Sequence, residues 1–474
     1  MKRATLARWL VVAAAALALF AAGCGGGVGS GGTGISPDVA QGTVNGFGSV
    51  IVDGDRFDDS QVATFEEDAP GDQTRTEVLL GERVELEADA TGALTRLRVD
   101  AALLGAVDRV DAPAGFVLLG QAVTINGDAT RGPVTQFAGG YTGAASVRAA
   151  DTVEVHGFIV RSAGGVAIQA TRVERRAALP AYLKLTGLAS AIDATGFQLG
   201  SLRILTASAT VLPAGATLAE GQVVSVLAPL ASLVGPPGAP AQVDAAQLRI
   251  RSAGSAGDEV RISGVIGLFD AASARFDLGG TTVNAVGADI RPDGASLADG
   301  LYVQARGTMQ RDGSVRAESV RIRDGRSEAE AELKGNVAGL DLATLRFSVR
   351  GVAVDASTAE IESCPNGVLA EGQFVAVEGA LGATGVIAKS VHCEDEPDGA
   401  TVERKGTAGS VDAAASRFTL TPRSGAPIAV RWTETTYFKH VTPATLAGQR
   451  VEVEGKLVDG VLVAQQVEVE SDDD

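Results

Sequence analysis

The chain has 474 residues, too many for one ordinary domain, and length alone predicts about three. Its formal net charge is −18, and no basic stripe interrupts the excess of acidic residues. Sequence-independent nucleic-acid binding depends on neutralising phosphates, so we expect no nucleic-acid partner. The regular alternation of apolar residues and a hydrophobic share of 45 % argue against a disordered chain.

The N-terminus has the features of an export signal. Three basic residues precede an apolar run over residues 9–20, which is too short to span a membrane. The ending AAGC at residues 21–24 resembles the lipobox of bacterial lipoproteins, with alanine replacing the usual leucine. The resemblance implies that residues 1–23 are removed and that Cys24 becomes a lipidated N-terminus. An ordinary cleaved signal with an incidental cysteine is the alternative.

The residues after the cysteine indicate where the chain is held. Residues 24–40 are rich in glycine and predict a flexible tether. Position 25 is glycine, whereas many inner-membrane lipoproteins carry aspartate there. The resemblance therefore implies a lipid anchor at the outer membrane, on its periplasmic or surface face, which makes the membrane a partner.

A stretch led by glycine or aspartate, with an apolar residue at every second position, recurs along the chain. Its copies are GERVELEA at Gly81, DTVEVHGF at Asp151, GQVVSVLA at Gly221, GLYVQARG at Gly300, GQFVAVEG at Gly372 and GQRVEVEG at Gly448. This alternation predicts a strand behind a tight turn. Near-constant spacing predicts six repeats, at 41–100, 101–177, 181–251, 258–324, 331–395 and 402–471.

Each repeat has a pattern of about five strands. So few short strands cannot bury both faces as an open sheet, and open edges promote aggregation. Closure into a barrel removes those edges. We therefore predict an all-β fold, a tandem array of about six small OB-like β-barrels. Modules this small are individually marginal, so we expect neighbours to pack at least weakly, although the joints between them resemble linkers. An immunoglobulin-like sandwich is the competitor, but it usually needs about 100 residues and seven strands.

The first two repeats carry a more specific pattern. The first repeat has Gly46, Phe47, Gly48, Ser49 and Val50, then a valine-rich strand, a turn at Gly54, and Phe57 followed by Asp58. The second has LLGQAVTINGDAT. Both stretches resemble the bacterial domain of unknown function 5666. The resemblance covers nearly all of the chain after residue 41, with a divergent third repeat, and implies a repeated barrel in an exported protein without implying an activity.

Two cysteines lie in the fifth repeat. In an exported protein, Cys364 and Cys393 most simply form a disulfide. A free thiol pair or a metal site with His392 is the alternative, although further ligands are not evident nearby.

Few other residues are candidates for catalysis or metal binding. His156, His392 and His440 lie in different repeats without metal-binding spacing or a nucleophile motif, and we expect partly exposed structural roles for them. Acidic clusters begin at Asp53 and Cys393 and end the chain. Calcium binding is the alternative for them, but none has the spacing of an EF-hand, and solvated charge is ordinary at turns and ends. We therefore predict no metal, no cofactor and no catalytic residue.

The densest aromatic patch, WTETTYFKH, begins at Trp432. Exposed aromatic side chains stack on sugars and bases, so Trp432 and Phe438 are candidate ligand-binding residues. Tyr437 occupies a slot that is aliphatic in three other repeats, so the repeat predicts it as a core residue. The patch can also be core throughout.

The expected function is that of a non-enzymatic, membrane-tethered binding or structural scaffold of the cell envelope. Its partner would be an envelope protein or a glycan. The alternatives are an oligosaccharide- or peptide-binding surface lipoprotein and, more remotely, a hydrolase of envelope polymers.

Overall fold

The structure is a computed structural model. It describes residues 39–47, 50–57, 59, 62–88, 94–111, 115–236, 238–323, 330–364, 368–393, 402–421, 427–439, 441–458 and 460–469. Cys24 and His440 lie outside these ranges, as do residues 24–38 of the predicted tether and the acidic tail at 470–474, whereas residues 39–40 of that tether already belong to the first strand. Within them, no helix is long and apolar enough to span a membrane.

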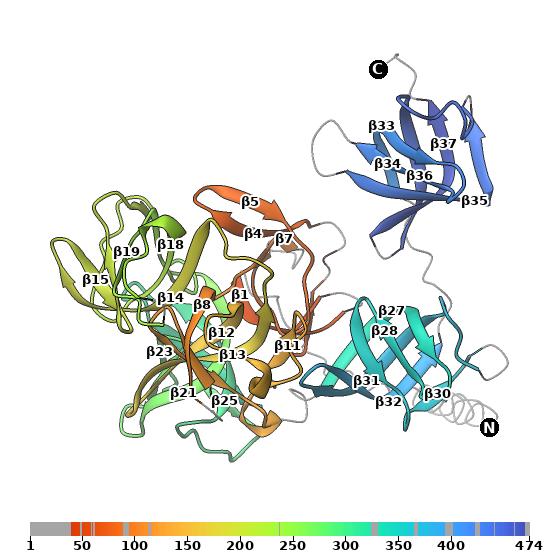
Figure 1. Cartoon of the computed structure of the whole chain (residues 1–474). Coiled ribbons are helices and arrows are strands. Elements are labelled where there is room, and N and C mark those ends of the chain that lie inside the picture. The colour runs from red at the N-terminus through yellow and green to blue at the C-terminus, as the bar shows by residue number, and fades with distance from the viewer. Residues whose placement is uncertain are drawn as a thin grey trace, which may run out of the picture. The chain divides into compact units, whose positions relative to one another are not determined.

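The sixth repeat shows the topology most simply (Figure 1). Its strands are β33 (Val402–Asp412), β34 (Arg417–Thr421), β35 (Ile428–Lys439), β36 (Arg450–Val458) and β37 (Val461–Val469). They close in the order β33-β34-β35-β37-β36. Only the β35–β37 pairing is parallel. This antiparallel five-stranded barrel, with the third strand parallel to the fifth, is the predicted OB-like arrangement.

Repeats 4 and 5 close in the same way, with the third strand divided in two. Repeat 4 has β21 (Glu259–Asp270), β22 (Arg275–Leu278), β23 (Thr281–Asn284), β24 (Asp289–Arg291), β25 (Tyr302–Met309) and β26 (Val315–Ile322). Repeat 5 has β27 (Glu330–Asp341), β28 (Arg346–Val349), β29 (Val352–Asp355), β30 (Glu360–Glu362), β31 (Phe374–Gly382) and β32 (Gly385–Cys393). Both halves of the third strand pair in parallel with the fifth.

Repeats 2 and 3 add insertions to this frame. Repeat 2 has β8 (Leu103–Asp111), β9 (Gly115–Leu118), β10 (Gln121–Ile125), η1 (Ala129–Arg131), β11 (Gln136–Ala138), η2 (Ala144–Ser146), β12 (Thr152–Ser162) and β13 (Gly165–Arg175). Repeat 3 has β14 (Tyr182–Asp193), β15 (Gly196–Leu199), β16 (Leu202–Leu205), β17 (Thr210–Leu212), β18 (Val223–Pro229), η3 (Leu230–Ser232), β19 (Gln242–Asp244) and β20 (Gln247–Ile250). The first strand again pairs with the fourth in both repeats.

Repeat 1 has a less regular third strand. Its elements are β1 (Val39–Gly46), β2 (Val50–Val52), β3 (Asp55–Phe57), β4 (Thr64–Ala69), β5 (Asp72–Arg75), β6 (Arg83–Ala88) and β7 (Leu94–Val99). Strand β4 pairs in parallel with β7, while β5 extends β4 as a hairpin. Strand β6 pairs with both β1 and β7.

The position of the recurring glycine in the sequence motif has the same structural role in every repeat. Its amide donates to a carbonyl of the first strand, as in the bond of 2.8 Å from Gly221 to Ala189 and the bond of 2.7 Å from Gly448 to Ala408. The backbone there is left-handed, with φ of +77° at Gly221 and +80° at Gly448, which favours glycine. Repeat 2 uses Ala150 at this position, one residue before the aspartate that the sequence pattern had indicated.

The barrels do not pack only with their neighbours in sequence. One hydrophobic core joins repeats 2 and 3, and another joins repeats 1 and 5. Strand β1 also pairs in parallel with β21 of repeat 4, through Val39–Gln41 and Val260–Ile262. The expectation of weak packing between neighbouring barrels is therefore incomplete, because repeat 1 contacts several repeats that are distant in sequence.

Candidate functional site

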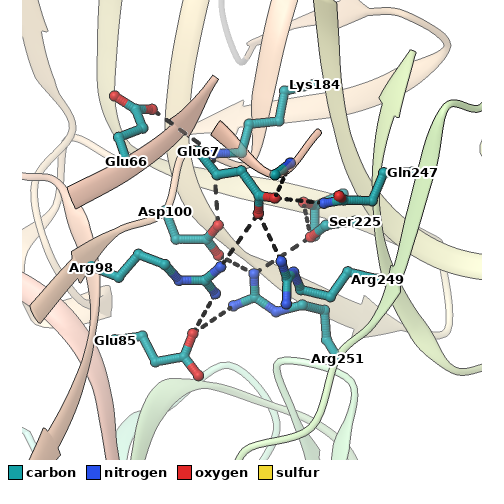
Figure 2. A network of polar contacts seen from close by, with 12 residues as sticks. Glu66, Glu67, Glu85, Arg98, Asp100, Lys184, Ser225, Gln247, Arg249 and Arg251 are labelled. Atoms are coloured by element: carbon teal, nitrogen blue, oxygen red, sulfur yellow. Dashed lines mark hydrogen bonds and ion pairs between the residues drawn. The ribbon is translucent and has the colours of Figure 1, made fainter. Parts of the chain in front are cut away.

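A buried network of charged side chains joins repeats 1 and 3 (Figure 2). Repeat 1 supplies the four carboxylates, and repeat 3 supplies three of the four cations. The carboxylates are Glu66, Glu67, Glu85 and Asp100, and the cations are Arg98, Lys184, Arg249 and Arg251. The network is therefore a junction between two barrels that lie far apart in the chain.

Glu67 lies at the centre of this junction. Its Oε1 accepts a hydrogen bond of 2.7 Å from Gln247 Nε2, and its Oε2 accepts one of 2.8 Å from Arg249 Nη2. Burial alone would raise the pKa of Glu67, but these two partners outweigh it and lower the pKa. Strands β4 and β20, which carry these residues, are thereby fixed against each other.

A second set of ion pairs flanks Glu67. Arg98 on β7 lies directly opposite Glu85 on β6 in the antiparallel register, and Arg98 Nη2 donates to Glu85 Oε2 at 2.5 Å. Arg251 forms a short ion pair with Asp100. Burial of Asp100 is outweighed by the charges of Arg251, Arg98 and Lys184, which hold the pKa of that carboxyl well below its usual range.

Glu66 differs from its neighbour Glu67 because its charge is poorly compensated. Lys184 Nζ lies 3.8 Å from Glu66 Oε1 and also 3.8 Å from Asp100 Oδ1. Burial raises the pKa of Glu66 from 4.5 to about 7, and the shared Lys184 charge offsets this only in part. The Glu66 carboxyl therefore changes its protonation state near neutral pH.

A buried histidine extends the junction to repeat 2. His156 is fully buried on β12, with its Nε2 3.0 Å from Glu154 Oε1 and 3.8 Å from Glu82 Oε1. Burial lowers the pKa of His156, but the Glu154 hydrogen bond and the Glu82 charge outweigh it and raise the pKa. The expectation of a partly exposed histidine was wrong here, because repeat 1 covers this strand.

The two carboxylates beside His156 respond in opposite directions. For Glu154, burial is outweighed by the His156 hydrogen bond and charge and by Arg176, which lower its pKa to about 2. For Glu82, burial dominates over the His156 charge and raises the pKa. His156 Nδ1 has no hydrogen-bond partner among the described residues.

A cleft of about 690 Å³ lies beside this junction. Residues of repeats 1 to 4 line it, including Arg83, Arg161, Thr186, Gln222, Thr281 and Asn284. Its volume is within the range of about 300–1,000 Å³ that is typical of small-ligand sites, which occur preferentially where domains meet. The cleft is therefore the best candidate for a binding site in the described part of the chain.

The predicted site residues fall elsewhere. Cys364 and Cys393 form the predicted disulfide, which connects the residues around β30 to the end of β32. His392 is exposed on β32, with Nδ1 3.6 Å from Glu362 Oε2. Cys24 lies outside the described residues, so its lipidation remains a prediction.

Trp432 belongs to the core of repeat 6, and the partly buried Phe438 packs against that core. Trp432 is only 8 % exposed and packs edge-on against Phe438, with ring centroids 5.9 Å apart. It also lies against Phe418, at 6.1 Å. This packing accounts for Trp432 as a core residue and leaves its ring face poorly placed to stack on a ligand.

The first acidic cluster of the sequence is also structural where it is described. The carboxylate of Asp53 is buried and accepts hydrogen bonds from Tyr302 Oη at 2.9 Å and from Ser263 Oγ. Asp55 accepts one of 2.9 Å from Gln304 Nε2 and forms a short ion pair with Arg261. Among the described residues, no group of three or more histidine, cysteine or acidic side chains is arranged to hold a metal ion.

Fold and junction together define an all-β protein of repeated OB-like barrels that pack through buried ion pairs. Three regions of the chain, residues 105–174, 334–392 and 405–468, match the family model described as a domain of unknown function (DUF5666). They lie in repeats 2, 5 and 6, and they confirm the resemblance to a repeated domain of that family. No curated protein matches the chain.

Proposed function

We propose that the protein is an exported envelope scaffold, tethered to the membrane through Cys24, whose barrels hold envelope components at fixed separations. The observation that carries this proposal is the buried junction of Glu67, Arg98, Arg249 and Arg251. Barrels connected only by flexible linkers would not need charged groups buried between repeats that are distant in sequence. A buried polar network whose main charges are paired instead favours one arrangement over its alternatives.

A non-enzymatic role is part of this proposal. The buried His156 lies between two carboxylates, and this arrangement stabilises an imidazolium ion. It does not resemble a histidine that activates a hydroxyl or thiol group. The junction residues are likewise engaged with one another, which suits structural stabilisation.

Tethering can be tested by expressing the chain in a Gram-negative host fed with an alkyne analogue of palmitate. The full chain should incorporate the label and fractionate with the outer membrane. A Cys24→Ser variant should do neither, whereas a Cys364→Ser variant should still be labelled. An unlabelled full chain would contradict the proposed lipid anchor.

The scaffold role can be tested by affinity capture from detergent-solubilised envelopes. We expect the full chain to retain a defined set of envelope proteins or glycans. An Arg249→Gln variant, which loosens the junction, should lose part of that set, and Arg96→Gln, which removes an exposed pair, should retain all of it. Identical sets from all three chains would contradict a function that depends on the arrangement of the barrels.

A further inference from the structure

Two arginines that line the cleft are paired with carboxylates. Arg251 pairs with Asp100, and Arg161 Nη1 lies 3.2 Å from Asp277 Oδ2. The carboxylate of Glu220 also lines the cleft and accepts a hydrogen bond of 2.8 Å from the backbone amide of Ile192. The two arginines therefore have ion-pair partners and do not need an anionic ligand.

Arg83 differs from these two arginines because it is half-buried without an ion pair among the described residues, whereas Arg275, which also lines the cleft without one, is exposed. Its Nη1 donates to two neutral hydroxyl groups, Thr43 Oγ1 at 3.1 Å and Ser263 Oγ at 3.4 Å. Its guanidinium carbon lies 5.4 Å from the ring centroid of Phe158. Within the described part of the chain, no carboxylate forms an ion pair with this half-buried group. Stacking and one-sided hydrogen bonding hold the guanidinium in place without a direct ion pair, and Ser263 links it to the buried carboxylate of Asp53.

The barrel fold does not require arginine at this position. Arg83 is the third residue of the recurring motif, and the corresponding residues of the other repeats are Thr152, Val223, Tyr302, Phe374 and Arg450. Arginine also occurs in repeat 6, so the case for Arg83 depends on its place in the cleft lining. A planar guanidinium is well suited to bind a carboxylate through two parallel hydrogen bonds.

The rest of the lining indicates what would carry that carboxylate. Neutral side chains with hydroxyl and amide groups surround the cleft, namely Thr186, Gln222, Thr281, Thr282 and Asn284. Such groups both donate and accept hydrogen bonds, as a ligand with many hydroxyl groups requires. We propose that the cleft binds a short acidic oligosaccharide whose carboxylate pairs with Arg83.

The proposal is tested by isothermal titration calorimetry on the full mature chain, with trigalacturonate as the probe. Trigalacturonate should bind, whereas neutral maltotriose and the acidic peptide triglutamate should not. Arg83→Gln should weaken trigalacturonate binding at least tenfold. The matched control Arg96→Gln should not change it, because Arg96 is an exposed partner of Glu87 on the same barrel.

A second variant keeps the test decisive if Arg83→Gln fails to fold. Thr282 is exposed and lines the cleft, so Thr282→Trp should block the cleft and abolish binding without removing Arg83. Absence of binding by the full chain at millimolar trigalacturonate would overturn the proposal. So would unchanged binding by either cleft variant, or equally tight binding of triglutamate.

Discussion

Replacing Glu66 by glutamine should make the protein more stable at high pH. Burial raises the pKa of this carboxyl from 4.5 to about 7, which corresponds to about 3 kcal/mol between its two protonation states. Glutamine is a neutral isostere, so Glu66→Gln removes the cost of burying the ionised group. Asp100 remains as the partner of Lys184, 3.8 Å away.

The sign of the effect follows from the raised pKa. Below about pH 4.5 the Glu66 carboxyl is protonated in both the folded and the unfolded chain, so variant and wild type should have similar stability. Between pH 4.5 and about 7 the unfolded carboxyl ionises while the folded one retains its proton, and the wild type loses stability. Above that range the variant should be more stable by about 3 kcal/mol.

Thermal unfolding followed by far-ultraviolet circular dichroism at pH 4, 6 and 8 would measure this difference. A unit the size of repeats 1 to 3 should shift its midpoint by roughly 6–12 °C at pH 8. Glu87→Gln is the matched control, because Glu87 is exposed on β6 and its pair with Arg96 contributes less than about 1 kcal/mol. If Glu66→Gln is no more stable than wild type at pH 8, the assignment of Glu66 as a poorly compensated buried acid is wrong.

Three further substitutions test other parts of the structure. Cys364→Ser should lower the stability of repeat 5 by about 3–4 kcal/mol. Reductant should lower the calorimetric melting temperature of wild type but not of this variant, and an equal shift in both proteins would contradict a structural disulfide. Arg251→Ala leaves the carboxylate of Asp100 buried without its main partner and should cost about 3 kcal/mol in urea unfolding, against less than about 1 kcal/mol for the exposed Arg96→Ala. Gly196→Ala places a methyl group 1.9 Å from a backbone oxygen and should cost about 1–3 kcal/mol, and unaltered melting of that variant would argue against the close approach of β15 and β16.

Much of the barrel architecture could be predicted because it is encoded locally. Period-two alternation and the motif glycines specify a strand and its turn within a few residues, and the six copies reinforce each other. The left-handed backbone at Gly448 is one consequence that the motif indicated. The disulfide was also predictable, because only two cysteines lie in the repeats.

The junction could not be predicted because its partners are far apart in sequence. Glu67 and Arg249 are 182 residues apart in the sequence. Both lie at strand positions that would face solvent in an isolated barrel. His156 was expected to be partly exposed for the same reason. Only the docking of repeat 1 on repeats 2 and 3 turns these outward-facing positions into buried ones.

The most direct test of the account is a double-mutant cycle between Glu67 and Arg249. Unfolding free energies of wild type, Glu67→Gln, Arg249→Gln and the double variant give the coupling between two side chains from different barrels. Direct contact at 2.8 Å predicts a coupling of about 1–3 kcal/mol. A coupling of zero, within the roughly 0.3–0.5 kcal/mol expected for independent sites, would show that repeats 1 and 3 do not form this junction.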